Sequence, residues 1–125
     1  MPDFIEASAT LPVSDIARAR EFYENVLGLQ AENETPGGVN YKAGSVHLFV
    51  YPSQFAGTNQ ATAATLIVDD VEAAVAELRD KGVTFLEYDF QGLKTVDGIA
   101  EIEGEKGAWF KDPEGNILAV AQLTG

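Results

Sequence analysis

Acidic side chains gather late in the chain, and they form the densest group of residues that could do acid–base chemistry. Glu87 and Asp89 are followed by Glu101, Glu103 and Glu105. Two neighbouring carboxylates can share a proton or hold a cation. Alternation along a strand would place Glu101 and Glu103 on one face, where they could line the rim of a binding site. A solvated acidic loop is the commoner structure for such a run, and both interpretations stay open.

The single histidine is the other candidate for acid–base chemistry. His47 lies between Val46 and Leu48 in an apolar run. If Leu48 points into a cavity, alternation makes His47 point away from it. We therefore favour a structural role for His47 over a role as a general base.

Aromatic residues on expected strands could form the wall of a cavity. Such a wall suits a flat or amphipathic organic molecule, although core packing would use the same residues. Trp109 is the best single candidate for a pocket residue. The group is Tyr41, Phe49, Tyr51, Trp109 and Phe110.

Composition narrows the classes of partner. The chain has 125 residues, a formal net charge of -12 and no cysteine. The negative charge argues against nucleic acid and anionic membranes, and it would favour a cationic ligand, although acidity also simply maintains solubility. The lack of cysteine excludes disulfides, zinc–thiolate sites and thiol nucleophiles. The first ten residues do not resemble a signal peptide and no apolar run could span a bilayer, so we expect a soluble, cytoplasmic protein.

The elements that would position these residues follow a regular order in the first half of the chain. Residues 9–15 read as a short strand that leads into a helix over 16–27, with Ser14 or Asp15 as a helix cap and Gly28 as a stop. Residues 35–38 read as a turn. Residues 39–52 read as two strands joined around Ala43–Gly44.

The second half repeats this order. After a polar linker, residues 64–82 again read as strand, cap, helix and glycine stop. Residues 83–89 read as a strand, 91–98 as irregular, and 99–106 as a strand or an acidic loop. The turn Asp112–Gly115 joins strands at 108–110 and 116–123, and we expect it to have no catalytic role.

The two halves also share residues. Thr10–Ala19 and Thr65–Ala74 agree at five of ten positions, at an offset of 55 residues. This indicates an internal repeat of strand, helix and three strands. The predicted organisation is one domain over 1–125, with module one at 4–53, a linker at 54–62 and module two at 63–124.

Three segments resemble the vicinal oxygen chelate superfamily, which includes glyoxalases, bleomycin resistance proteins and extradiol dioxygenases. They are LPVSDIARAREFYENVLGL, LIVDDVEAAVAELRDKGV and FKDPEGNILAVAQ. The resemblance implies an α+β fold in which two βαβββ modules form a cup-shaped, curved mixed sheet. It also implies a small-molecule partner in the cup and a homodimer.

Enzymes of this superfamily usually hold a divalent metal on four strand positions. Carried over by motif, these positions are Ser8, Leu48, Ala63 and Ala119. Leucine and alanine have no donor atom, and a lone serine hydroxyl is a poor ligand. We therefore predict no metal and no cofactor.

The predicted function is binding or sequestration of a small organic, possibly cationic, compound in the cup. The pocket would comprise Ser8, Thr10, Leu48, Ala63, Thr65, Glu101, Glu103, Trp109 and Ala119. One alternative is a lyase, isomerase or dioxygenase that uses a non-standard acid–base or metal site, for which Ser8, Glu101 and Glu103 are candidates. Another is a subunit whose cup is vestigial and which serves in dimerisation or regulation.

Overall fold

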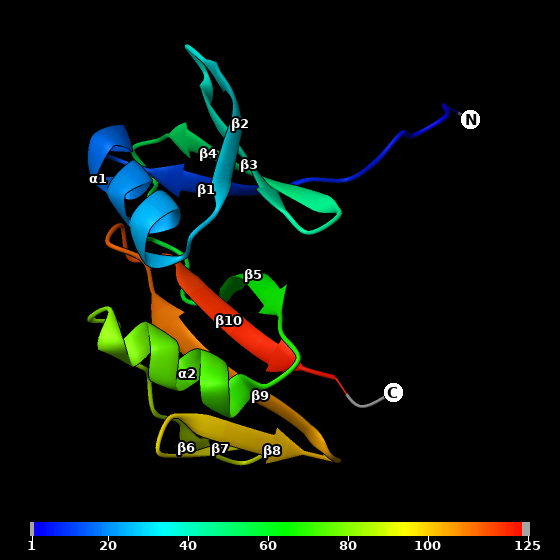
Figure 1. Cartoon of the computed structure of the whole chain (residues 1–125), viewed down its shortest axis with the longest axis vertical. Helices are drawn as coiled ribbons and strands as arrows, with labels where there is room; N and C mark the ends of the chain where they lie inside the picture. Colours follow the sequence, from blue (N-terminus) through cyan, green and yellow to red (C-terminus); the bar gives the residue numbers. More distant parts are fainter. Residues whose placement is uncertain (1, 124–125) are drawn as a thin grey trace.

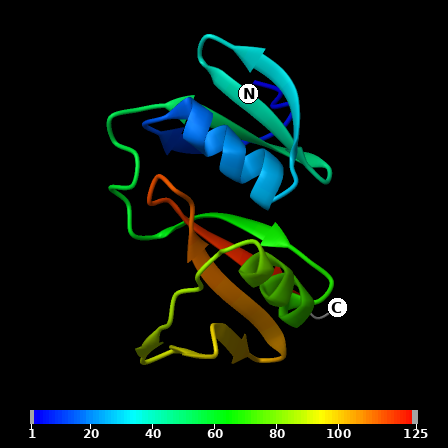
Figure 2. The same cartoon turned by 60° about the vertical axis from the view of Figure 1, so that its left-hand side comes forward.

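The computed structural model describes residues 2–123, so positions 1, 124 and 125 of the predicted domain lie outside the described part. Its strands form two sheets, one from each half of the chain. Figure 1 places the first half above the second, and Figure 2 shows the linker running along one side between them. The α+β fold with two βαβββ modules, expected from the sequence, is confirmed.

Module one contains a four-stranded mixed sheet in the order β1-β4-β3-β2. Its strands β1 (Ala9–Val13) and β4 (Val46–Pro52) are parallel, whereas β3 (Gly38–Ala43) pairs antiparallel with β4 and with β2 (Gln30–Thr35). The helix α1 (Ile16–Arg20) continues into a π-helical segment, η1 (Glu21–Val26). The carboxylate of Asp15 accepts the backbone N–H of Arg18 and so caps α1, as predicted.

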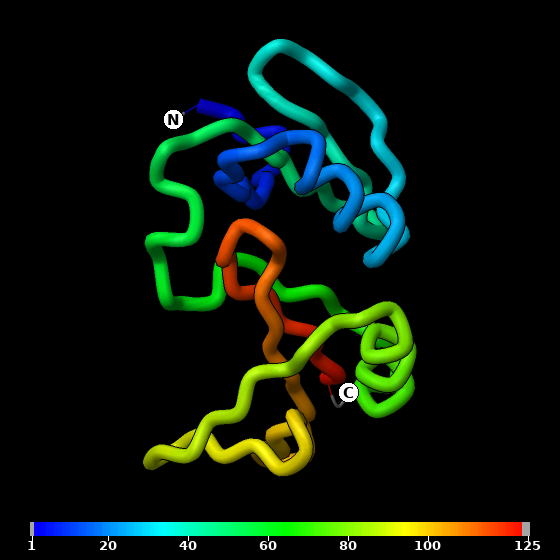
Figure 3. The backbone as a smooth tube through the Cα atoms, turned by 90° about the vertical axis from the view of Figure 1, so that its left-hand side faces the viewer, coloured from blue at the N-terminus to red at the C-terminus, as the bar shows by residue number. Residues whose placement is uncertain are grey.

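Module two contains a six-stranded sheet in the order β5-β10-β9-β8-β7-β6. Strand β5 (Thr62–Ile67) is parallel to β10 (Ile117–Gln122), and the other pairs are antiparallel. The remaining elements are α2 (Val71–Asp80), β6 (Asp89–Phe90), β7 (Leu93–Val96), β8 (Ile99–Ile102) and β9 (Glu105–Lys111). Figure 3 shows β6–β8 at one end of the molecule and the β2–β3 hairpin at the other.

The sequence interpretation of residues 83–98 was wrong. The expected strand at 83–89 makes only an isolated bridge, between Phe85 and Phe110, before the two residues of β6. The stretch expected to be irregular, 91–98, contains β7, which follows the turn at Gly92. Strand β2 was not predicted, because its residues are almost all exposed and carry no apolar alternation.

Each sheet has one face that carries its helix. In module one the Tyr41 hydroxyl donates to Glu24 of η1, and in module two Lys106 contacts Glu72 of α2. The buried side chains of both helix-bearing faces belong to one shared core. We call the opposite face of each sheet its open face. Within residues 2–123, no helix is long and apolar enough to cross a membrane.

The turn Asp112–Asn116 fastens module two to module one. The Tyr23 hydroxyl donates to the buried Asp112 carboxylate at 2.6 Å, and the Asn116 amide donates to the Pro12 carbonyl at 2.8 Å. The Glu114 carboxylate accepts the Ser14 hydroxyl at 2.6 Å. We call this set of contacts, which also includes the Asp15 N–H and the Arg18 guanidinium, the inter-module clasp.

The clasp shifts the ionisation of its members. Burial alone would raise the pKa of Glu114, but the hydrogen bonds from Ser14, Arg18 and Asp15 outweigh it and lower the pKa to about 2. Burial and the neighbouring Asp112 carboxylate raise the pKa of the Tyr23 phenol well above its usual range. At neutral pH the Glu114 carboxylate of the clasp is therefore ionised and the Tyr23 phenol is neutral.

Candidate functional site

The open face of module two is built on two central strands. Trp109 of β9 pairs with Ala119 of β10, and both alternate with residues of the core, so both point to the open face. Gly107, two residues before Trp109, lies beside the indole, where a Cβ would be 3.4 Å from the ring, at contact distance. Ala119 is only 4% exposed and forms the floor of this face.

Three aromatic side chains form a wall above this floor. The Tyr88 ring meets the Trp109 indole edge to face, with centroids 5.5 Å apart, and meets Phe90 in the same way at 5.9 Å. The indole N–H donates to the Thr62 hydroxyl at 3.1 Å. We call Tyr88, Phe90 and Trp109 the aromatic wall. Phe90 is 59% exposed, so the wall presents apolar surface to an incoming molecule.

The open face of module one is more polar. Phe49 and Tyr51 of β4 stack with their rings nearly parallel, 6.2 Å apart. Thr10 pairs with Phe49 across the parallel strands and is exposed. Ser8 precedes β1, and its hydroxyl donates to the His47 carbonyl at 3.2 Å.

His47 also lies on the open face of module one, contrary to the prediction. Its neighbour Leu48 points to the helix-bearing face instead. Leu48 is 4% exposed and pairs with the buried Tyr41 of β3. The error came from assigning Leu48 to the cup. His47 Nε2 lies 2.8 Å from a Glu32 carboxylate oxygen, and its buried Nδ1 has no hydrogen-bond partner among the described residues. The nearest acidic oxygen to Nδ1 is that of Glu6, at 3.5 Å.

The predicted pair of acidic pocket residues does not form. Glu101 pairs with Lys106, on the same face as the contact between Lys106 and α2, so it belongs to the helix-bearing face. Glu103 lies in the turn after β8, with φ of 53°, because the strand ends at Ile102. The alternation that would have aligned Glu101 with Glu103 therefore stops before Glu103.

Ala63 is displaced by an irregularity in β5. Ile117 pairs with Thr62 and Leu118 with Ala64, so the register shifts at Ala63, which packs against the core. Thr62, not Ala63, reaches the open face and contacts Trp109. Thr65 pairs with Ala119 and shares its face. The structure thus brings Thr65, Trp109 and Ala119 together, and places Ser8 and Thr10 on the other module.

The donor set on the open faces does not fit the metal that the superfamily implies. Of the four carried-over positions, Leu48 and Ala63 face the core, Ala119 has no donor atom, and Ser8 offers one hydroxyl. His47 and Glu32 add an imidazole and a carboxylate on module one, and Thr62 and Thr65 offer hydroxyls on β5 of module two. Among residues 2–123, no three His, Cys, Asp or Glu side chains gather in a metal-binding group.

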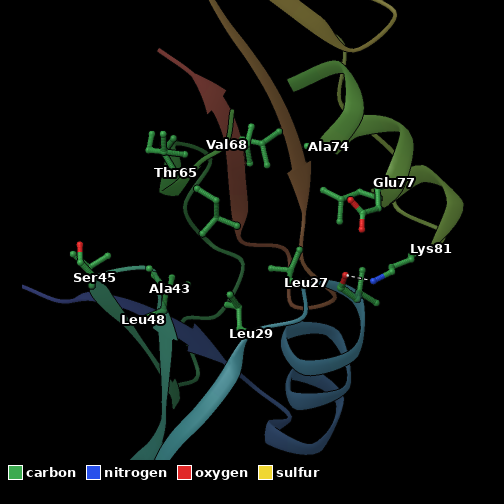
Figure 4. Close-up of a pocket in the computed structure, with 17 residues that line it drawn as sticks. Leu27, Leu29, Ala43, Ser45, Leu48, Thr65, Val68, Ala74, Glu77 and Lys81 are labelled. Carbon is green, nitrogen blue, oxygen red and sulfur yellow. Dashed lines mark hydrogen bonds between the residues drawn. The ribbon is translucent and has the colours of Figure 1, made fainter. Parts of the chain in front are cut away.

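A groove lies between the modules. It has a volume of about 630 Å³ and is lined mainly by apolar side chains of η1, β3–β4, β5 and α2. In Figure 4, Ala74 and Glu77 of α2 face Ala43, Ser45 and Leu48 of module one across it. Leu48 and Thr65 of the predicted pocket line this groove.

Sequence reasoning missed three residues of the open faces. Tyr88 and Phe90 lie in the stretch whose strands were misplaced, and Glu32 lies in the unpredicted β2. A signal for the first two was present, because aromatic residues alternate at 88 and 90 as they do on a half-buried strand.

Comparisons with known proteins bear on the family and the fold of the chain. The model of the Glyoxalase/Bleomycin resistance protein/Dioxygenase superfamily matches residues 7–120. No curated protein matches the chain. Similar solved structures include UcmS2, at 18% identity and a TM-score of 0.77, over 98% of this chain and 100% of that one.

Two further solved structures differ in their described activities. One is TnmS3, an antibiotic binding protein from Streptomyces sp. CB03234, at 21% identity and a TM-score of 0.68 over 99% of both chains. The other is lactoylglutathione lyase from Agrobacterium tumefaciens, at 20% identity and a TM-score of 0.70, covering 98% of this chain and 96% of that one. At these identities they show the fold alone. Together with the family match they confirm the resemblance in the sequence, and the chain belongs to the glyoxalase/bleomycin resistance protein/dioxygenase superfamily.

Proposed function

We propose that this protein binds a small, flat organic molecule against the aromatic wall of module two, without a metal, and acts by sequestering it. The observation that carries the proposal is the contact of Tyr88 with both Trp109 and Phe90 on an open sheet face. Aromatic rings offer large apolar contact with defined geometry, which suits a planar ligand. Ala119, paired with Trp109, has no donor atom, so a ligand on this floor would be held by van der Waals contact and not by a metal.

A cationic ligand fits the charge of the chain. The net charge of -12 attracts cations, and an indole face adds a cation–π contribution. The similarity to a protein described as antibiotic binding supports sequestration, and the similarity to a lyase supports catalysis, so neither decides between them.

A homodimer is part of the proposal. Residues of the two open faces are only partly covered within one chain, and Phe90 is largely exposed. A second copy would cover the aromatic wall and enclose the ligand on a further side. Pockets that enclose most of a ligand are the usual form of small-molecule sites. The proposed location is the cytoplasm, and a chain without cysteine is compatible with reducing conditions there.

The single tryptophan makes the test direct, because intrinsic tryptophan fluorescence reports on the aromatic wall alone. We expect the planar cation ethidium to quench this emission saturably, and the anionic dye anilinonaphthalene sulfonate to bind more weakly. Trp109→Phe should keep part of the affinity, followed by dye anisotropy, while Trp109→Ala should lose at least about tenfold. Tyr51→Ala, on the open face of module one, is the matched control. Equal losses from Trp109→Ala and Tyr51→Ala would contradict the assignment of the site to module two.

The metal-free part has its own test. Protein purified without chelator should contain no stoichiometric metal, and Ni, Zn, Mn or Fe(II) should leave the melting temperature unchanged within about 1 °C. A bound equivalent with a large rise in melting temperature would overturn this part of the proposal.

Acid–base catalysis is a second candidate, favoured by one observation. The 2.8 Å contact of Glu32 with His47 holds the imidazole beside an acceptor, as in general acid–base pairs. Any catalysed reaction of the bound molecule should then fall at least about 100-fold in His47→Asn, with binding to Trp109 retained. Unchanged turnover in that variant would exclude this role for His47.

A further inference from the structure

A second cavity, with a volume of about 330 Å³, lies between the linker and the end of β9 in module two. Its lining includes Gly57, Asn59, Gln60, Leu86, Tyr88 and Lys111. We call this cavity the linker pocket. It adjoins the proposed binding surface, because Tyr88 belongs both to its lining and to the aromatic wall.

Lys111 lies on the same face of the sheet as Trp109. The two residues flank Phe110 of the core on β9, so alternation directs both to the open face, with their Cα atoms about 7 Å apart. Lys111 is exposed and pairs with Ile117, another residue of the pocket lining. A substituent of a planar molecule on the aromatic wall is therefore within reach of the Lys111 ammonium.

The charge that the linker pocket offers to a ligand is positive. None of the ion pairs within residues 2–123 involves Lys111. The other charged residue of the lining is Glu87, whose carboxylate accepts the Thr95 hydroxyl and the Gly98 N–H. These two bonds commit the Glu87 carboxylate to the β7–β8 hairpin. Lys111 is thus the charged group left to meet a ligand, and an ammonium favours an anionic partner.

The linker adds a neutral donor and holds its place. The Asn59 amide oxygen accepts the Ala61 N–H at 2.9 Å, which leaves the Asn59 NH₂ group available to donate. Gly57 packs against the clasp turn so closely that a Cβ there would lie 2.3 Å from the Glu114 carbonyl oxygen. The pocket is therefore preformed, and an ammonium with an amide N–H is a donor set that suits a carboxylate.

We propose that the linker pocket binds a carboxylate of the ligand, paired with Lys111, while the ring system of the same ligand lies against the aromatic wall. This inference rests on the proposed function and narrows its ligand class to planar zwitterions, which combine a cationic ring system with one carboxylate. A zwitterion has no net charge, so the net charge of -12 does not repel it as it would repel an anion.

The first test compares two dyes that differ at one group. Tetramethylrhodamine combines a planar cationic ring system with a benzoate, and its methyl ester lacks the negative charge. At physiological ionic strength we expect the free acid to bind at least about tenfold more tightly, measured by fluorescence anisotropy, because only the acid can pair with Lys111. Equal affinity for the two dyes would overturn the proposal.

Fluorescein tests the cationic half of the ligand class. It keeps the benzoate but has no cationic ring system, so we expect it to bind at least about tenfold more weakly than tetramethylrhodamine. Binding of fluorescein as tight as that of tetramethylrhodamine would overturn the assignment to zwitterions.

The second test changes the lysine. Lys111→Gln should lower the affinity for tetramethylrhodamine at least about tenfold and leave that for the methyl ester within about twofold, whereas Lys111→Arg should keep most of the preference for the acid. Lys42→Gln, at an exposed position of β3 in module one, is the matched control, because it changes the net charge by the same amount. Equal losses in Lys111→Gln and Lys42→Gln would show that the overall field of the chain selects the acid, and would overturn the proposal.

The third test changes the linker side of the pocket. Asn59→Asp is nearly isosteric and keeps the oxygen that accepts the Ala61 N–H, but it replaces the donor with a negative charge. We expect the affinity for tetramethylrhodamine to fall at least about fivefold and that for the methyl ester to change little. Asn33→Asp, at an exposed position of β2, is the control and should leave the preference for the acid unchanged. An unchanged preference in Asn59→Asp would place the carboxylate outside the linker pocket and overturn the proposal.

Trp109→Ala separates this proposal from the one on which it rests. We expect this variant to bind both the acid and the ester more weakly, while Lys111→Gln weakens the acid alone. If Trp109→Ala weakens both dyes but the unsubstituted protein does not prefer the acid, the aromatic wall binds the ligand and the carboxylate site is wrong. If the unsubstituted protein binds neither dye nor ethidium, both proposals are wrong.

Discussion

The two modules share a fold, but their side chains differ at two equivalent places, the turn at the end of the sheet and the open face. At the sheet-end turn, module two presents Asp112 and Glu114, whereas module one presents Ala43, Gly44 and Ser45. The first turn closes the contact between the modules and the second leaves a groove of about 630 Å³. The backbone plan is therefore common to both, and a few side chains decide which end of the contact is closed and which is open.

The open faces differ in the same way. Module two presents the aromatic wall over alanine, whereas module one presents His47 with Glu32 and the stacked pair Phe49 and Tyr51. In a repeat, features that both modules share serve folding, while features of one module alone are the candidates for function. We therefore propose contact binding on module two and any proton transfer on module one.

The largest expected effect comes from Asp112. Its carboxylate accepts the Tyr23 hydroxyl and the backbone N–H groups of Glu114 and Asn116. Asp112→Ala leaves these buried donors unpaired, and we expect a loss of about 3 kcal/mol in the free energy of unfolding. Urea unfolding followed by circular dichroism measures it. Ser45→Ala, in the corresponding turn of module one, should change stability by less than about 0.5 kcal/mol. A comparable loss in both variants would remove the contrast between the turns.

Glycine substitutions extend the same contrast. A Cβ at Gly57 would lie 2.3 Å from the Glu114 carbonyl oxygen, and Gly57 has φ of 71°. Gly57→Ala should therefore lose about 2 kcal/mol or more, from backbone strain together with steric overlap at the clasp turn. Gly44 has φ of 62° but open space around it, so Gly44→Ala should lose about 1 kcal/mol from strain alone. Thermal unfolding of the two variants side by side tests whether the extra cost at Gly57 comes from the clasp.

The acid dependence of the clasp follows from Glu114. Its pKa is about 2 in the folded chain and near 4.5 when unfolded, so it stabilises the fold above pH 4.5 and this contribution disappears as the pH falls toward 2. Arg18 is half exposed, so we expect Glu114→Gln to lose only about 1 kcal/mol at pH 7. The difference from the unsubstituted protein should shrink below pH 4.5 in urea unfolding. A difference that is constant with pH would show that the charge of Glu114 contributes nothing.

The sequence predicted the fold because its signals are local and repeated. Asp15 and Asp70 cap their helices, and the apolar stripes of both helices face the shared core. The same reasoning failed to predict the strands of residues 83–98. Strands β6 and β7 have only two and four residues, and their positions depend on pairing with each other and with β8. Strand β2 depends likewise on its neighbour β3.

The candidate site was predictable only in part. The sequence put Trp109 in the pocket as an aromatic strand residue and Ala119 by the superfamily motif, and the two residues are paired across β9 and β10 in the structure. The irregularity at Ala63 and the end of β8 before Glu103 each break the alternation. The first leaves no mark in the sequence, whereas Gly104 marks the turn that ends β8. The clasp contacts join residues about 100 positions apart, so the sequence identified the turn and gave no indication of its partner on α1 and η1.

The smallest effect concerns how Trp109 is held. Its indole N–H donates to Thr62, so Thr62→Val removes the acceptor while preserving the side-chain shape. We expect the affinity for ethidium to fall about three- to fivefold, because a neutral hydrogen bond that fixes the ring contributes about 1 kcal/mol or less. Thr10→Val makes the same change on the open face of module one, where Thr10 lies beside Phe49, and should leave the affinity unchanged. Red-shifted tryptophan emission in Thr62→Val alone would support a loosened indole. Equal effects of the two variants would mean that both faces contact the ligand, and the division of roles between the modules would then be wrong.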